Sequence, residues 1–250
     1  MAANINFHPS EALLRGYADG TLSAGLNVVI SAHLEQCKDC RDRVAELENI
    51  AACEWVESSK EMLCSSDYDG SSELGETDII RENPTAKLSH LVTDITSHPQ
   101  HREMNPADES VTEIHMLDHS VRLPKVLARA ASDGLVWKKM TSGINQASVM
   151  LDDQTQCEFL YIKPGAKVPV HKHQGTEVTL VLDGSFTDEM GKYQKSDFVM
   201  RNKTHTHHPA SEEGCLCFSV LDSPLTFTSG LARLLNPFLR YRFSRATSMS

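Results

Sequence analysis

A histidine and two cysteines lie close together in the segment HLEQCKDC, residues 33–40. His33 and Cys37 are four positions apart, so on a helix they share one face. Cys40 follows three positions later and can join them from the last helical turn or from the next loop. Zinc prefers a tetrahedral set of cysteine and histidine ligands, so this spacing indicates a zinc site. The alternative without a metal is a helix-capping histidine beside two buried thiols.

A tetrahedral zinc site needs a fourth ligand, and the sequence upstream of the trio offers one histidine, His8. His8 stands just before SEALLRGYADGTLS, whose apolar spacing predicts a helix. His8 reaches the other three side chains if that helix packs against the next one. From the residues alone, His8 is equally well an ordinary residue near the terminus.

A second group of metal-binding residue types lies in GAKVPVHKHQGTEVTLVLDG, residues 165–184. His171 and His173 are two positions apart and Glu177 has the same parity, so on a strand all three face one side. Imidazoles with one carboxylate suit a divalent metal such as zinc, iron, manganese or nickel. The alternative is a histidine-rich loop in solvent beside a barrel that holds no metal.

The apolar pattern predicts two kinds of structure along the chain. Residues 9–50 predict three consecutive helices that start near positions 10, 23 and 38. Residues 65–83 are polar, acidic and rich in Gly and Ser, which predicts a flexible insertion, and residues 84–97 regain helical spacing. From about residue 119, short apolar or alternating runs separated by turn residues predict an all-β sandwich or barrel.

We therefore predict an α+β multidomain chain, with an all-α four-helix domain followed by an all-β domain. The predicted boundaries are 1–98 for the helical domain, 99–118 for a linker and 119–240 for the β domain.

Composition narrows the function classes. The chain has 250 residues, a formal net charge of −10 and a pI of about 5.6, which argues against direct nucleic-acid binding. Neither a signal peptide nor a run of about 18 apolar residues is visible, so we expect a cytoplasmic protein without a membrane partner. Seven cysteines in a reducing compartment favour metal sites or free thiols over disulfides.

Five of these cysteines lie outside the trio, and the sequence supports an expectation for four of them. Cys215 and Cys217 are two apart on a predicted strand, and we expect buried thiols there, with a redox pair as the alternative. Cys53 and Cys64 are expected to be structural or surface thiols on or after the third helix.

The N-terminal residues resemble a known family. His8, then PSEALLRGYADGTLS, then His33-x3-Cys37-x2-Cys40 is similar to the zinc-binding domain of bacterial anti-sigma factors. The resemblance implies that His8, His33, Cys37 and Cys40 are the four zinc ligands. It also implies a four-helix domain that keeps an extracytoplasmic-function sigma factor away from core RNA polymerase.

The spacing G-x5-H-x-H-x3-E-x6-G, from Gly165 to Gly184, resembles the first cupin motif at every fixed position. This resemblance implies a small β-barrel that holds a divalent metal, which we expect to be zinc. The second cupin motif, which supplies one more histidine, must lie in residues 193–215, although Ser196 stands where a glycine is common.

The fourth cupin ligand is ambiguous, because His205 and His207 have the same parity. We prefer His207, since THHPASEEGCLC resembles the corresponding segment of cupin anti-sigma factors. The resemblance thus implies a metal site formed by His171, His173, Glu177 and His207.

The two motifs together resemble the ChrR-type anti-sigma factors. This resemblance implies a non-catalytic transcriptional regulator that binds one sigma factor, in a 1:1 complex, and inhibits it. Release would follow oxidative stress such as singlet oxygen, with the cupin domain as the sensing module. The alternative is a metal-dependent cupin dioxygenase, in which the zinc domain serves as a tether.

Overall fold

The structure is a computed structural model. It describes residues 5–64, 93, 96–97, 113–115, 120–228, 233–234, 236–237, 241 and 243–244. The predicted acidic insertion at 65–83 and most of the predicted fourth helix at 84–97 lie outside these residues. One compact unit is formed by Met1–Glu54 together with Glu109–Ser250, and a second unit by Trp55–Asp108.

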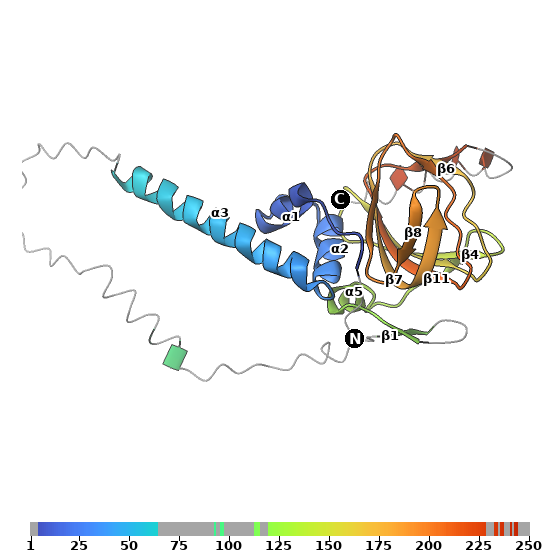
Figure 1. Cartoon of the computed structure of the whole chain (residues 1–250), viewed down its shortest axis with the longest axis horizontal. Coiled ribbons are helices and arrows are strands. Elements are labelled where there is room, and N and C mark those ends of the chain that lie inside the picture. The colour runs from blue at the N-terminus through green and yellow to red at the C-terminus, as the bar shows by residue number, and fades with distance from the viewer. Residues whose placement is uncertain are drawn as a thin grey trace, which may run out of the picture. The chain divides into compact units, whose positions relative to one another are not determined.

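Three helices follow one another at the start of the chain (Figure 1): α1 (Glu11–Ala18), α2 (Ala24–Leu34) and α3 (Lys38–Cys64). The side chains of Ser10 and Ser23 cap α1 and α2 by accepting hydrogen bonds from backbone N–H groups in the first turns. The three helices predicted from the apolar spacing are therefore confirmed. We call residues 5–54 the helical segment.

The C-terminal part is built mainly of strands, as the sequence predicts. In chain order, the elements are β1 (Glu113–His115), β2 (Ser120–Arg122), α5 (Lys125–Ala130), β3 (Lys138–Lys139), β4 (Ile144–Val149), β5 (Gln156–Ile162), β6 (His171–His173), β7 (Glu177–Asp188), β8 (Gly191–Gln194), β9 (Phe198–Arg201), β10 (Thr206–His207), β11 (Cys215–Leu221) and β12 (Leu225–Phe227). We call residues 120–228 the β domain.

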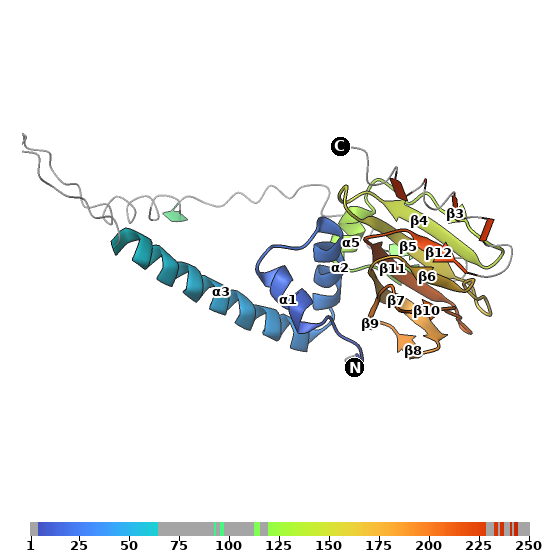
Figure 2. The ribbon, with the colours of Figure 1, turned by 90° about the horizontal axis from the view of Figure 1, so that it is seen from above.

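The strands pair antiparallel in two main sheets. The larger sheet has the order β3-β4-β5-β11-β7-β8, with β9 also paired to β7, and the smaller sheet has the order β10-β6-β12 (Figure 2). Strand β11, late in the chain, lies between β5 and β7 and pairs with both along its whole length. The described strands form separate sheets and not one closed sheet, so closure of the barrel stays a prediction.

The larger sheet is covered on both faces, which explains why every residue of β11 is buried. Leu216, Phe218 and Val220 point to one face and share a core with Val29 and Ile30 of α2. The alternate residues of β11 point to the other face and line the interior of the β domain, as the period of two requires. The helical segment therefore packs on the outer face of the sheet.

Hydrogen bonds fix both ends of α2 to the rest of the compact unit. At the first turn, the backbone N–H of Gly25 donates to the Asp152 carboxylate at 2.8 Å. Beyond the last turn, the Glu35 carboxylate accepts from the backbone N–H groups of Lys125 and Val126 at 3.0 and 3.2 Å, which caps α5. This helical docking on the sheet was not predicted from the sequence.

Candidate metal centres

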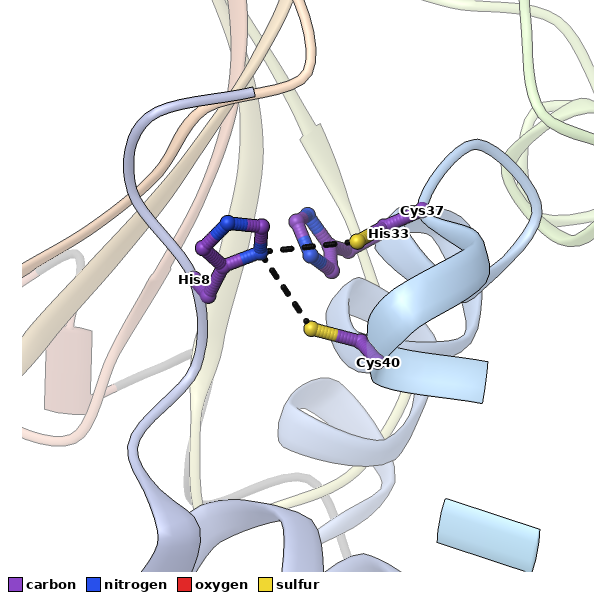
Figure 3. A group of neighbouring side chains, drawn as sticks. All are labelled: His8, His33, Cys37 and Cys40. Carbon is purple, nitrogen blue, oxygen red and sulfur yellow. Dashed lines mark hydrogen bonds between the residues drawn. The ribbon is translucent and has the colours of Figure 1, made fainter. Parts of the chain in front are cut away.

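The first candidate centre is the Cys/His cluster, formed by His8, His33, Cys37 and Cys40. One ligand atom from each of these residues lies within 4.8 Å of those of the others. His33 is near the end of α2, Cys37 lies in the turn after it and Cys40 lies in the first turn of α3. Figure 3 shows the His8 ring, from the segment before α1, pointing at both sulfurs.

The spacing of these atoms suits a tetrahedral metal. The His8 Nδ1 atom is 3.4 Å from the Sγ atoms of both Cys37 and Cys40. Zinc bonds of 2.0–2.3 Å in a tetrahedron separate neighbouring ligand atoms by roughly 3.3–3.8 Å. The residues present therefore fit a zinc ion by both their chemistry and their spacing.

The His33 ring is oriented for ligation by a group from the β domain. Its Nδ1–H donates to the Ser196 carbonyl oxygen at 3.1 Å, so the other ring nitrogen, Nε2, carries the lone pair. That Nε2 atom is buried and has no hydrogen-bond partner among the described residues. A buried nitrogen lone pair without a partner is costly unless a ligand satisfies it.

Burial keeps the His33 side chain of this cluster free of positive charge. It lowers the pKa of His33 to about 4, so the imidazole is neutral at pH 7. Burial, followed by the neighbouring Cys37, raises the pKa of the Cys40 thiol to about 12. A metal that binds here must displace the Cys40 proton, and it would supply the positive charge that a thiolate needs.

The second candidate centre is the His/Glu cluster, formed by His171, His173, Glu177 and His207. Its ligand atoms also lie within 4.8 Å of one another. His171 and His173 come from β6, Glu177 opens β7, and His207 on β10 pairs directly with His171. The parity argument placed the first three on one side, and the structure brings them together.

The structure places His207, and not His205, in this cluster. The His207 Nε2 atom is 3.0 Å from the Nε2 atoms of both His171 and His173. His205 is absent from the group, and its Nδ1 instead accepts a hydrogen bond from the backbone N–H of Asn202 at 3.3 Å. The residue preferred from the sequence is thus the one that lies with the others.

The interior of the β domain makes His171 and His173 neutral ligands. Burial, with His207 nearby, lowers the pKa values of His171 and His173 to about 4. The cluster adjoins a cavity of about 90 Å³ with a mostly apolar lining. Neutral imidazoles and one carboxylate, Glu177, fit a divalent metal.

Hydrogen bonds behind the ligands fix their ring orientations. The His171 Nδ1–H donates to the Pro169 carbonyl at 2.9 Å, and the His207 Nδ1–H donates to Asp188 Oδ2 at 3.1 Å. Burial by itself would raise the pKa of Asp188, but hydrogen bonds from His207 and Arg201 outweigh it and hold that pKa well below its usual range. Asp188 is therefore a carboxylate that supports His207.

The sequence analysis missed Asp188 because a bulge changes the parity of β7. Cys217 pairs with Val181, whereas the preceding Leu216 pairs with Asp183, so Leu182 is an extra residue in this strand. Strict alternation from Glu177 would put Asp188 outside. The glycine at 184, with a φ of 72°, was the only local signal of an irregular strand.

The remaining described thiols are free. Cys215 and Cys217 are buried in the interior, as predicted, with their sulfurs 3.3 Å apart, and the neighbouring Cys215 and burial together raise the pKa of Cys217 well above its ordinary value. Cys53 is exposed on α3. The side chain of Cys64 lies outside the described residues.

Two parts of the chain match known protein families. Residues 10–41 match the family described as "Putative zinc-finger", and residues 127–223 match the family described as "ChrR Cupin-like domain". The chain thus combines a zinc-finger-like helical segment with a cupin-like β domain. The first match contains three members of the Cys/His cluster, and the second contains the whole His/Glu cluster.

The chain is similar to the Anti-sigma-E factor ChrR of Cereibacter sphaeroides, which is 29% identical over 241 residues, 94% of this chain and 99% of that protein. A crystal structure of Rhodobacter sphaeroides SigE in complex with the anti-sigma ChrR has the same fold: the TM-score is 0.58 at 24% identity, over 88% of this chain and 100% of that chain. The resemblance to the ChrR-type zinc-binding anti-sigma factors is confirmed. No helix among the described residues is long and apolar enough to span a membrane.

Proposed function

We propose that this protein is a cytoplasmic anti-sigma factor that binds and inhibits an extracytoplasmic-function sigma factor in a 1:1 complex. The observation that carries the proposal is the Cys/His cluster, set within a helical segment that matches a zinc-finger family. Support comes from the similarity to Anti-sigma-E factor ChrR, which extends along 94% of this chain. The acidic net charge of −10 suits a protein partner with a basic surface.

His8, His33, Cys37 and Cys40 would hold a zinc ion that stabilises the helical segment. Tetrahedral zinc held by two cysteines and two histidines is structural and leaves no position for a substrate. It ties the segment before α1, the end of α2 and the start of α3 to one point. The four-helix form of this domain, its boundaries at 1–98, the linker at 99–118 and the β domain at 119–240 belong to the same proposal.

His171, His173, Glu177 and His207 would hold a divalent metal, which we expect to be zinc, inside a cupin barrel. When bound, that ion would supply a Lewis-acidic centre beside the cavity. Asp188 and the Pro169 carbonyl hold the His207 and His171 rings with their Nε2 atoms toward the centre. The apolar cavity lining keeps bulk water away from these groups.

We infer that the β domain is the sensing module and that oxidative stress such as singlet oxygen releases the sigma factor. The helical segment is fixed on the sheet of that domain through Gly25, Asp152 and Glu35. A chemical change inside the β domain therefore has packed elements through which it can alter the helical segment.

The test is affinity capture with the full chain as bait, read out by mass spectrometry of retained sigma factors. Wild type is compared with the double variant Cys37→Ser/Cys40→Ser, and Cys53→Ser serves as a control that changes an exposed thiol on α3. We expect a sigma factor retained by wild type and Cys53→Ser and lost with the double variant. Purified wild type should also inhibit transcription by that sigma factor. If none of the baits retains a sigma factor, the proposal is contradicted.

The cavity beside the His/Glu cluster favours one alternative, a metal-dependent cupin dioxygenase with the Cys/His cluster as a tether. Oxygen consumption by the metal-loaded chain, offered 1,3-dicarbonyl or thiol substrates, measures this activity. Turnover that disappears in His171→Ala would establish the enzyme, whereas the regulator should give no turnover above that variant.

A further inference from the structure

The β8–β9 segment, residues 191–201, contains two strands that pair with different parts of β7, and it lies against both candidate clusters. We propose that this segment couples them, with Tyr193, Arg201 and the neighbouring Asp188 acting as positioning residues. Through these residues, ligation in the interior of the β domain determines how firmly the Cys/His cluster holds its metal. The inference rests on the proposed function, because it requires that both clusters bind metal.

On the helical side, the β8–β9 segment supports two of the four Cys/His ligands. The Ser196 carbonyl accepts the Nδ1–H of His33 at 3.1 Å. The buried Asp197 carboxylate accepts the backbone N–H groups of Asn6 and Phe7 at 2.8 and 3.2 Å, and Phe198 N–H donates to the Phe7 carbonyl at 2.9 Å. Phe7 precedes His8, so the β8–β9 segment positions His8 as well as His33.

Ser196 also makes a side-chain contact toward the cysteines. Its Oγ–H donates to the Gln36 side chain, which directly precedes Cys37. Ser196 is buried and has a φ of 75°, in the left-handed region where glycine is favoured and other residues are strained. The side chain at this turn therefore adds a bond to the helical segment that the glycine common in cupins would lack.

On the interior side, the connection runs through hydrogen-bonded side chains. The Phe7 and Tyr193 rings have centroids 4.8 Å apart, and Arg201 Nη2–H donates to the Tyr193 hydroxyl at 2.6 Å. The same Arg201 nitrogen donates to Asp188 Oδ2 at 2.8 Å, and that oxygen accepts the His207 Nδ1–H at 3.1 Å. Every step from His207 to the residue beside His8 is a direct contact.

Burial makes this connection rigid. The side chains of Asp188, Arg201 and His207 are only 0%, 7% and 7% exposed. Charged hydrogen bonds are strong in such a low-dielectric setting, and leaving any one of these groups without its partner is costly. A displacement of the His207 ring therefore alters the positions of Asp188 and Arg201, because no solvent separates these side chains.

The expected direction follows from how the His207 ring is held. With Nε2 in a ligand bond and Nδ1–H donating to Asp188, the ring is fixed at both nitrogens. Without the ligand bond, Asp188 holds the ring at one nitrogen alone, and a ring that shifts weakens the hydrogen bond that Asp188 accepts. Arg201 and the Tyr193 ring then lose order, and the segment that carries His8 rests on Tyr193. Loss of the interior ligand bond should loosen His8.

The experiment uses the full chain loaded with Co²⁺. The thiolate-to-cobalt charge-transfer band reports the Cys/His cluster alone, because the His/Glu cluster has no sulfur ligand, and its loss in Cys37→Ser/Cys40→Ser verifies the assignment. The rate at which the band decays in excess chelator is compared in wild type, His171→Ala, Tyr193→Phe and the double variant. Each single variant should speed the decay by about tenfold, and the double variant should be no faster than either single one.

Matched controls separate coupling from general damage. Tyr17→Phe removes another tyrosine hydroxyl. That hydroxyl is hydrogen-bonded to Ser31 at 2.9 Å within the helical segment, away from the β8–β9 segment. Glu189→Gln removes the carboxylate next to Asp188, which bonds to the exposed His208. Both controls should decay like wild type.

The outcomes separate this inference from the proposed function. A wild-type decay rate in Tyr193→Phe, or rates that multiply in the double variant, would overturn the coupling and leave both metal sites in place. A wild-type chain that shows no cobalt–thiolate band would overturn the proposed function and the coupling with it.

Discussion

The two candidate metal clusters differ in how they are built. The Cys/His cluster joins three short segments at the edge of the helical segment, with His8 exposed, and its His8–Sγ distances of 3.4 Å are those of a tetrahedron. The His/Glu cluster lies inside the β domain, and its Nε2–Nε2 distances of 3.0 Å are shorter. Ligands at right angles, with bonds of about 2.1 Å, lie roughly 3.0 Å apart.

This difference separates a closed site from one that borders a cavity. Four ligands at tetrahedral spacing complete the coordination of zinc, whereas the His/Glu cluster lines a cavity inside the β domain. The β domain also has its own buried core, while the apolar residues of the helical segment are buried largely against its sheet. We therefore expect the first metal to be needed for folding and the second to be needed for response.

Removal of the thiols should give the largest effect. In Cys37→Ser/Cys40→Ser, the helical segment would lose the proposed zinc ion and with it several kcal/mol of stability. Hydrogen exchange measured by mass spectrometry should show peptides within residues 24–50 losing protection while peptides from β5 and β11 keep theirs. The pair His171→Ala/His173→Ala should keep the helices protected. Equal loss of protection in both variants would erase the distinction between a structural and a responsive site.

Acid should destabilise the metal-free chain as its pH falls below about 6.5. Burial lowers the pKa values of His33, His171 and His173 to about 4, so the unfolded chain binds more protons than the folded chain between these values. The stability is present above pH 6.5 and is lost toward pH 4, by on the order of 1–3 kcal/mol per histidine. Urea unfolding at successive pH values measures the slope.

Replacement of one buried histidine sharpens the pH prediction. His33→Gln should reduce the slope of the unfolding free energy against pH by the contribution of one histidine. The surface variant His208→Gln should leave that slope unchanged. An unchanged slope in His33→Gln would mean that the imidazole in the Cys/His cluster is not held neutral by burial.

Gly25→Ala should weaken the packing of α2 on the sheet. A Cβ atom at this position would meet Thr155 Oγ1 at 2.3 Å and Cys157 Sγ at 2.7 Å. Overpacking of this kind costs about 1–3 kcal/mol in the free energy of unfolding. Gly16→Ala in α1 is the matched control, because the atom it meets is the flexible end of Leu22, and it should be neutral or stabilising. A neutral Gly25→Ala would contradict tight docking.

Asp152→Asn should have the smallest of these effects. The carboxylate accepts the backbone N–H of Gly25 at the first turn of α2, and hydrogen bonds from Gly25 and Thr155 outweigh burial to lower its pKa. Loss of this charged cap should cost about 1 kcal/mol by denaturant unfolding. Asp153→Asn, one position along, is the control. A cost equal to that of the control would show that the cap contributes nothing to docking.

Local sequence features were enough to predict much of this molecule. Ser10 and Ser23 marked the helix starts, and i,i+4 spacing put His33 and Cys37 together. Parity put His171, His173 and Glu177 on one side of the β domain. These predictions succeed because each depends on the geometry of a single helix or strand.

The features that were missed depend on contacts between distant segments. Asp188 turns inward only because of the bulge at Leu182. The side-chain hydrogen bond of Ser196 needs Gln36, which is 160 residues away in the sequence. The residues of α2 that pack on the sheet looked like the interior of a helical bundle. A single sequence does not show which apolar face of one element packs against which face of another.

The hydrogen bond from His33 to Ser196 also has a consequence for how the chain is made. These residues are 163 positions apart, so at 5–20 residues per second the ribosome needs roughly 8–33 s to make the second after the first. Throughout that interval the nascent helices exist without the β8–β9 segment that orients His33. All four residues of the Cys/His cluster are therefore made before the β domain that packs on the helical segment.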